Sequence, residues 1–110
     1  MAPVKVRLTE VAEIIRSKNS GPYELTLDII FREEVMFQRF CATKMINPNK
    51  IAGIYGVSPA EVLGIIEFQP AKAIKINLKR PIPSGGLGET DVYGAQQHAP
   101  LLDLEFELAD

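Results

Sequence analysis

Residues 23–31 read Tyr-Glu-Leu-Thr-Leu-Asp-Ile-Ile-Phe, and this stretch decides the fold class. From Tyr23 onward every second side chain is apolar, and Glu24, Thr26 and Asp28 fall between them. Because successive side chains of a β-strand point to opposite faces, the pattern predicts a strand with one apolar and one polar face. In an antiparallel sheet, one face can be exposed to solvent while the other packs against the core. The stretch therefore indicates an antiparallel sheet whose apolar face meets a core.

Further stretches predict strands of the same sheet. Residues 74–79 alternate Ile or Leu with Lys or Asn, and residues 102–108 alternate Leu or Phe with Asp or Glu. Since these two carry opposite charges, we expect them to be neighbouring strands. Residues 62–68 are apolar on both faces, which is typical of a central, covered strand. Residues 4–15 fit a strand at their start and a helix at their end.

Two helices are predicted after the first strand. No Gly or Pro interrupts residues 33–46, where apolar side chains recur at helical spacing. Asn47 followed by Pro48 is typical of an N-cap with proline in the first turn, and Gly56 of a helix end. Residues 58–61, Ser-Pro-Ala-Glu, have the form of a capping box and predict one more turn.

This order of elements predicts an α+β fold, with an antiparallel or mixed sheet and helices on one face. The ferredoxin-like, split β-α-β plan is the specific expectation. Residues 16–22 and 80–100 are polar and are expected to be irregular loops. Such a sheet leaves one face half open, so we expect a homo-oligomer, most simply a two-fold dimer. The expected core residues are Leu25, Leu27, Ile29, Phe37, Phe40, Ile74, Ile76, Leu78, Leu104 and Phe106.

Composition is that of a small globular protein. The 110 residues, of which 46% are hydrophobic, predict one domain over residues 1–110. A net charge of −2 gives little electrostatic support for nucleic-acid binding, and no apolar run is long enough to predict a membrane span. One cysteine excludes an internal disulfide, and one histidine excludes a multi-histidine metal site. Without a signal-like start, the expected location is cytoplasmic.

Familiar catalytic motifs are missing from the sequence: it has no phosphate loop, nucleophile elbow or zincin motif. Residues 85–88, Gly-Gly-Leu-Gly, lack the strand–helix context of a dinucleotide loop and are expected to form a surface loop. Cys41 adjoins Phe40 in a predicted helix and is expected to be a small core residue. These observations predict no cofactor and no metal, and they leave open whether the chain is an enzyme.

Two polar segments concentrate candidate binding residues. Residues 16–22 carry cations, an amide and hydroxyls that can hold a carboxylate or phosphate, although such residues also form solvated turns. Residues 89–98 contain His98, the weak candidate for acid–base catalysis. The same residues equally fit a loop whose polar side chains hydrogen-bond to its own backbone. If the strands after them run parallel, both loops converge on one site for an anionic ligand. The candidate ligand-binding residues are Arg16, Lys18, Asn19, Asp91, Tyr93, Gln97 and His98.

Longer motifs in these segments resemble a bacterial family of small domains of unknown function. Residues 17–31 read Ser-Lys-Asn-Ser-Gly-Pro-Tyr-Glu-Leu-Thr-Leu-Asp-Ile-Ile-Phe, and residues 88–103 read Gly-Glu-Thr-Asp-Val-Tyr-Gly-Ala-Gln-Gln-His-Ala-Pro-Leu-Leu-Asp. Residues 71–75, Ala-Lys-Ala-Ile-Lys, also resemble this family. That family is similar to the small ferredoxin-like domain that accompanies the large acyclic terpene utilisation protein. The resemblance implies a ferredoxin-like fold and a large partner protein of that type. It implies no particular activity, because none is established for the family.

Three functions remain open from the sequence. The first is an accessory small subunit that works with an acyclic-terpene-utilisation-type large protein on acyl-CoA or organic acids. The second is an autonomous small enzyme or binding protein for a small anionic ligand, with its site between residues 16–22 and 89–98. The third is a homo-oligomeric scaffold in which those loops make subunit contacts. Small size and the lack of a self-sufficient catalytic set favour the first.

Overall fold

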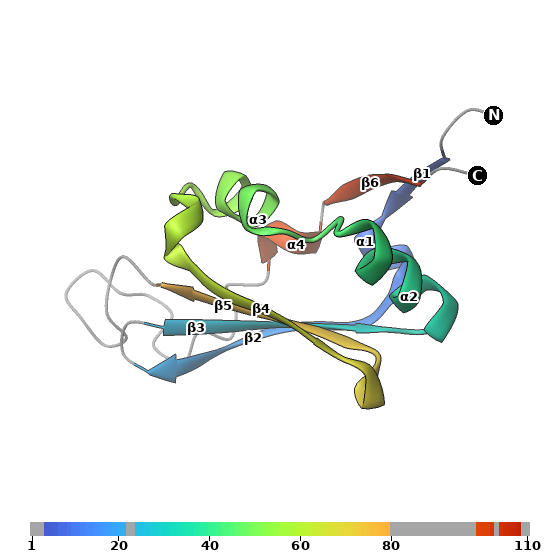
Figure 1. The fold of residues 1–110 in the computed structure, drawn as a ribbon, viewed down its shortest axis with the longest axis horizontal. Helices are drawn as coiled ribbons and strands as arrows, with labels where there is room; N and C mark the ends of the chain where they lie inside the picture. The colour runs from blue at the N-terminus through green and yellow to red at the C-terminus, as the bar shows by residue number, and fades with distance from the viewer. Residues whose placement is uncertain (1–3, 22–23, 80–98, 103, 109–110) are drawn as a thin grey trace.

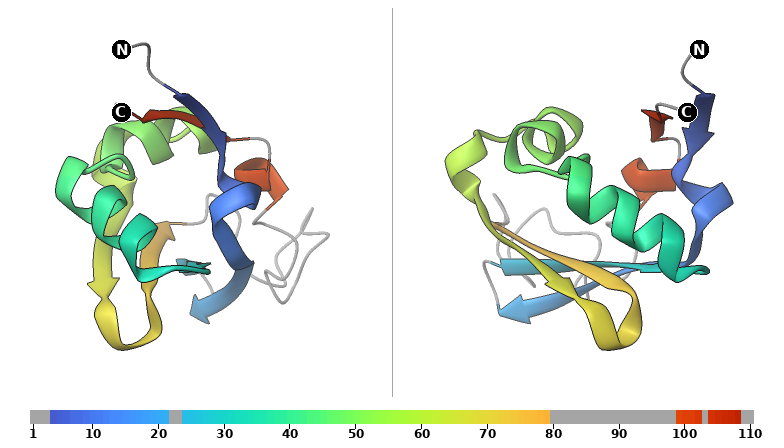
Figure 2. Two further views of the ribbon diagram at one scale, coloured as in Figure 1. Left: turned by 90° about the vertical axis from the view of Figure 1, so that its right-hand side faces the viewer. Right: turned by 45° about the vertical axis from the view of Figure 1, so that its right-hand side comes forward.

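Two antiparallel sheets and a layer of short helices form the protein (Figure 1). The computed structural model describes residues 4–21, 24–79, 99–102 and 104–108. Helices α2, α3 and α4 all lie on one side of the larger sheet (Figures 1 and 2). The predicted α+β class is therefore confirmed. No helix in these ranges is long and apolar enough to cross a membrane.

The larger sheet has four strands in the order β2-β3-β5-β4, and every neighbouring pair is antiparallel. Apolar residues of β3 stand opposite apolar residues of β5, as Leu27 does opposite Ile76, and they form the face that meets the helices. The alternation in the sequence thus produces the buried face of the sheet. The strands are β2 (Ala12–Gly21), β3 (Glu24–Phe31), β4 (Val62–Phe68) and β5 (Ala73–Lys79).

The smaller sheet pairs the first strand of the chain with the last. Strand β1 (Val4–Arg7) is antiparallel to β6 (Glu105–Leu108), and each basic residue of β1 stands opposite a Glu of β6. The prediction that the acidic strand lies beside residues 74–79 is wrong. Instead, β1 supplies the opposite charges, while β5 lies between β3 and β4.

Two helices connect β3 to β4, as the capping residues predict. They are α2 (Glu34–Thr43) and α3 (Pro48–Tyr55). The side chain of Asn47 accepts a hydrogen bond of 2.9 Å from the backbone N–H of Lys50, and Gly56 ends α3 with a φ of 67°. The remaining helical turns are α1 (Leu8–Val11), η1 (Pro59–Glu61), η2 (Gln69–Ala71) and α4 (Ala99–Leu102).

Phe40 lies at the centre of the core. Its ring centroid is 5.0 Å from that of Phe31 on β3 and 5.0 Å from that of Phe106 on β6, so it ties α2 to both sheets. A third ring, Phe37, packs edge-on against Phe31. The residues predicted for the core are buried, with the exception of Leu104, which is half-buried.

Three expectations about strands need correction. Residues 62–68 are predicted to be central, but β4 lies at the edge of the described sheet, because β5 is the one described strand with which it pairs. Residues 16–21 are predicted to be a loop, but they belong to β2, since pairing with β3 satisfies their backbone groups. Residue 102 is predicted to begin the last strand, but it ends α4 next to the fully buried Leu101, and β6 begins at Glu105.

The ferredoxin-like plan is not confirmed. Strands β3 and β4 run in the same direction with β5 between them, and α2 and α3 connect them, which is one split β-α-β unit. Strand β2, however, pairs directly with β3, its successor in the chain. The described residues contain no second unit of this kind.

Candidate functional site

Three of the seven predicted ligand-binding residues lie on β2, and the other four lie outside the described residues. Arg16 and Lys18 lie on β2 and share one face of the larger sheet, opposite Asp28 and Thr26 of β3. Asn19 also lies on β2, where its backbone stands opposite Leu25 of β3. A site shared by the two polar segments stays a prediction, because its second half lies outside the described residues. The residues concerned are Asp91, Tyr93, Gln97 and His98.

Arg16 and Lys18 lie on the side of the larger sheet that turns away from the helices, which we call the open face. No described helix or strand covers it (Figure 1). Because the strands are in register, its side chains form rows across all four strands. The apolar row consists of Ile14, Ile30, Ala73 and Phe68. The neighbouring ionic row consists of Arg16, Asp28, Lys75 and Ile66.

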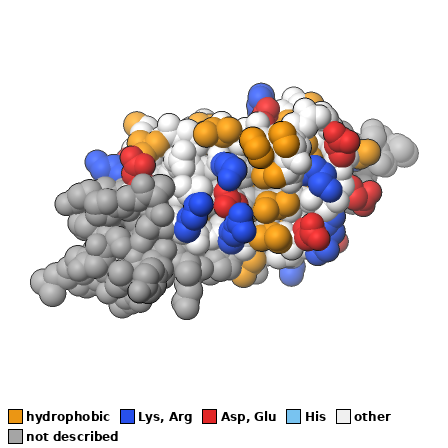
Figure 3. Space-filling model, turned by 90° about the horizontal axis from the view of Figure 1, so that it is seen from below, with side chains coloured by type: hydrophobic (Ala, Val, Ile, Leu, Met, Phe, Trp, Pro, Cys, Tyr) orange, Lys and Arg blue, Asp and Glu red, His pale blue; other side chains and the backbone are white. Residues whose placement is uncertain are grey.

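Large apolar side chains of these rows are open to solvent. Ile14 is 41% exposed, Ile66 is 51% exposed and Phe68 is 45% exposed. Fully burying one Ile or Phe side chain stabilises a structure by roughly 1.5–3 kcal/mol, so about half of that remains available at each position. Figure 3 views this face, where hydrophobic side chains gather beside a group of basic side chains that surround an acidic one.

Asp28 is the centre of the ionic row. Its side chain is only 2% exposed, and it lies between one cation from each flanking strand. The Nε of Arg16 donates to Oδ2 at 3.0 Å, and the Nζ of Lys75 lies 3.6 Å from Oδ1. Burying a carboxylate is costly unless opposite charges compensate it, which is what the two cations do. Oδ1 itself has no hydrogen-bond partner.

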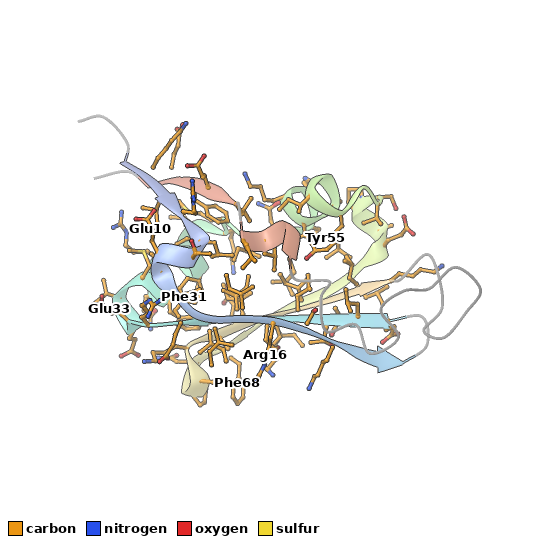
Figure 4. All side chains as sticks on the ribbon, turned by 180° about the vertical axis from the view of Figure 1, so that it is seen from behind. Glu10, Arg16, Phe31, Glu33, Tyr55 and Phe68 are labelled. Carbon is orange, nitrogen blue, oxygen red and sulfur yellow. The ribbon has the colours of Figure 1, made fainter. Side chains whose placement is uncertain are left out.

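The exposed side chains leave the sheet away from the core. Arg16 and Phe68 project on the side opposite the helices, whereas Phe31 points among the helices (Figure 4). The Nζ of Lys75 lies 6.0 Å from the centroid of the Phe68 ring, so this member of the ionic row comes within cation–π range of the apolar row. The two rows therefore form one continuous surface rather than two separate patches.

The third row of the open face is polar. The Oγ1 of Thr26 donates a 2.9 Å hydrogen bond to the Oδ1 of Asn77 in the interior of the sheet. Lys18 stands opposite Thr26 at the edge and is exposed. The face therefore changes along its strands from apolar, through charged, to polar.

Two hollows elsewhere among the described residues fit a charged ligand less well. One of about 470 Å³, between β1, β6 and α3, is lined by two lysines and two glutamates, whose charges cancel. Another of about 600 Å³ lies beside the exposed ion pair of Lys44 with Glu67, 3.1 Å apart. Neither contains a residue that the sequence singles out as a candidate.

Nucleophilic and metal chemistry find little support in the described residues. Burial, followed by the nearby Glu67 carboxylate, raises the pKa of the Cys41 thiol from 9.0 to about 11, so the thiol stays protonated near neutral pH. Burial likewise raises the pKa of Tyr55. Within the described ranges, no three side chains of His, Cys, Asp or Glu cluster in a way that could hold a metal ion.

The sequence comparisons place the chain in a family. The profile of a family described as "Domain of unknown function (DUF4387)" matches residues 8–105. The chain belongs to the DUF4387 family. The DUF4387 match spans β2 to β5, so the whole open face lies within the family domain. No curated protein and no solved structure matches the chain significantly. Membership of a family of small domains of unknown function is thus confirmed, and a link to terpene utilisation is not shown.

Sequence reasoning missed Asp28, Lys75, Ile66 and Phe68 as members of one surface. The period-two pattern places the first on the polar face of its strand, but the pattern does not say which strands flank it. The sequence shows a carboxylate between two apolar residues, Leu27 and Ile29, but its burial depends on the strands that flank β3.

Proposed function

We propose that this DUF4387 domain is a cytoplasmic accessory subunit that binds a larger protein through the open face. The observation that carries the proposal is the apolar row with Ile66 beside it, exposed on a sheet face that no described element covers. Contiguous apolar surface rimmed by charge is typical of protein–protein interfaces. Residues 62–68 are apolar on both faces of β4, a pattern typical of a strand that is buried on both of its faces.

The proposed partner follows from the sequence motifs. They resemble a family that accompanies the large acyclic terpene utilisation protein, so we propose a large protein of that type, acting on acyl-CoA or short organic acids. In this arrangement the larger protein carries the catalytic groups. The small subunit completes or stabilises it through contacts of the open face.

Charge substitution on the open face tests the proposal. The domain would be purified from its native host together with the untagged products of neighbouring genes, and the interaction would be reconstituted from the two purified proteins. Phe68→Lys places a charge in the apolar row and is expected to abolish the complex. Val35→Lys is the matched control, because Val35 is 70% exposed on α2, on the other side of the sheet. Equal loss of binding in both variants, or in neither, would refute the proposal.

The same exposed rows support a second candidate, a homo-oligomeric scaffold in which a second copy covers the open face. Sedimentation of the isolated domain separates the two candidates, since a scaffold associates without any other protein. A function in binding an anionic ligand between residues 16–22 and 89–98 stays a prediction, because the second segment lies outside the described residues.

A further inference from the structure

We infer that Arg16 recognises a carboxylate on the partner protein and that the buried Asp28 is the residue that positions Arg16 for it. This inference rests on the proposed function of the open face. The partner is expected to present an Asp or Glu side chain next to an apolar one. Arg16 would bind the acid, and the apolar row would bind its neighbour.

The geometry of the ion pair supports this role. Arg16 uses its Nε to donate to Asp28, and its side chain is 57% exposed. A guanidinium is planar, so fixing Nε also fixes the directions of the two terminal NH₂ groups. An arginine held in this way binds a carboxylate with less loss of conformational entropy than a mobile one.

Asp28 itself is not a docking point for the partner. Its side chain is 2% exposed, and Arg16 and Lys75 cover it from both sides. A basic group of a partner cannot reach it without displacing one of these cations. Its role is therefore to hold the two cations, and the charge that the partner meets is basic.

The charges of the open face favour an acidic partner. By strand register, four basic residues of the described chain lie on this face, against two acidic residues. One of the two acids is Asp28, which is already compensated by its two neighbours. The basic residues are Arg16, Lys18, Lys75 and Lys79, and the acidic residues are Glu24 and Asp28. Complementary charge selects an acidic surface over a basic one.

The spacing of the rows sets the form of the partner segment. Ile14 precedes Arg16 by two residues on β2 and lies on the same face. Two residues of a strand rise by about 6.7 Å. An acid and an apolar side chain separated by that distance fit both residues at once, as alternate positions of an extended segment do.

A peptide library provides the test. Random twelve-residue peptides displayed on phage would be selected on the wild-type domain, and the enriched peptides synthesised. We expect an Asp or Glu close to an aromatic or aliphatic residue. Arg16→Gln should lower their affinity by about tenfold or more, because hydrogen bonds to charged groups are worth roughly 1.5–3 kcal/mol. Arg16→Lys should not restore it fully, since lysine lacks the planar fork.

Two further variants separate positioning from general attraction. Lys18→Gln removes one positive charge from the same face without touching Asp28, and it should weaken binding less than Arg16→Gln does. Asp28→Asn makes the face more basic, so tighter binding of acidic peptides is expected if only the net charge of the face attracts them. Weaker binding is expected if Asp28 positions Arg16, because the ion pair that orients Arg16 is lost. Thermal unfolding of each variant confirms that it remains folded.

The outcomes for the inference and for the proposed function are distinct. Peptides that lose binding in Phe68→Lys but carry no excess of acids overturn the inference and leave the proposed function standing. The inference is also overturned if the affinity of acidic peptides is unchanged by Arg16→Gln or is raised by Asp28→Asn. If no peptide is enriched, or if binding survives Phe68→Lys, the open face is not the binding surface and both proposals fail. Arg7→Gln, an exposed arginine on β1, controls for loss of charge elsewhere.

Discussion

Phe40 is the residue on which the packing of both sheets depends. Its ring is 1% exposed and lies between Phe31 and Phe106. Replacing it by Ala leaves a cavity that α2 cannot fill alone, so Phe40→Ala should lower the free energy of unfolding by about 3–5 kcal/mol. Urea denaturation measures this. Phe68→Ala is the matched control, because its half-exposed ring should cost only about 1 kcal/mol. Similar costs at both positions would contradict this packing.

Cys41 is expected to be an unreactive thiol. Burial raises its pKa from 9.0 to about 11, with a further contribution from the carboxylate of Glu67, which also accepts a hydrogen bond from the thiol. At pH 8 the thiolate fraction is then up to about 100-fold lower than in an ordinary thiol, so iodoacetamide should alkylate Cys41 correspondingly slowly. Glu67→Gln should speed the reaction. Alkylation as fast as that of the unfolded chain would show that the thiol is not protected.

At the residue scale, the alternation in the sequence predicted which side chains face the core but not how a polar one is used. The alternation predicts that Asp28 is solvent-exposed on the polar face of its strand, but it is buried on that face because β3 is flanked by β2 and β5. The long side chains of Arg16 and Lys75 come from those neighbours. No local pattern in residues 23–31 contains this information, since it depends on which strands pair.

Short capping motifs are the elements that the sequence predicted best. In the turn η1, the backbone N–H and the hydroxyl of Ser58 both donate to Glu61, and these hydrogen bonds lower the pKa of the Glu61 carboxyl below its ordinary 4.5. A lowered pKa in the folded state contributes stability above pH 4.5 that is lost as the pH falls through the lowered value. Such motifs are local, so they need no knowledge of the tertiary fold.

Glu61→Gln should therefore destabilise the protein more at pH 7 than at pH 3. The charge-dependent hydrogen bonds exist at the higher pH in the wild type, and protonation weakens them as the pH falls through the lowered pKa. Urea midpoints of both proteins at the two pH values measure the difference. Ser58→Ala, which keeps the backbone donor and removes the hydroxyl, should show a smaller effect of the same sign. A wild-type advantage that grows in acid would contradict this account of the cap.

For the whole molecule, the class of fold could be predicted and the order of its strands could not. Residues 62–68 show why. An apolar pattern on both faces fits a central strand, and it fits equally an edge strand whose second face is covered by another protein. Pairing between β1 and β6 joins the two ends of the chain, and the sequence holds no local signal for it. Of the open face, the sequence singles out Arg16 and Lys18 as binding residues, and that role stays a prediction, whereas the apolar row depends on the strand order.

Salt should distinguish the two occupants proposed for the open face. In a face-to-face dimer the apolar rows attract each other, but the basic residues of both copies carry the same sign. Because the screening length falls from about 10 Å at 0.1 M salt to about 3 Å at 1 M, dimerisation should strengthen as salt rises. Binding of an acidic partner should weaken over the same range. Sedimentation velocity of the isolated domain would measure the first trend, with Phe68→Lys monomeric throughout and Val35→Lys like wild type. A dimer that dissociates in salt would mean that opposite charges, rather than the apolar row, hold the copies together.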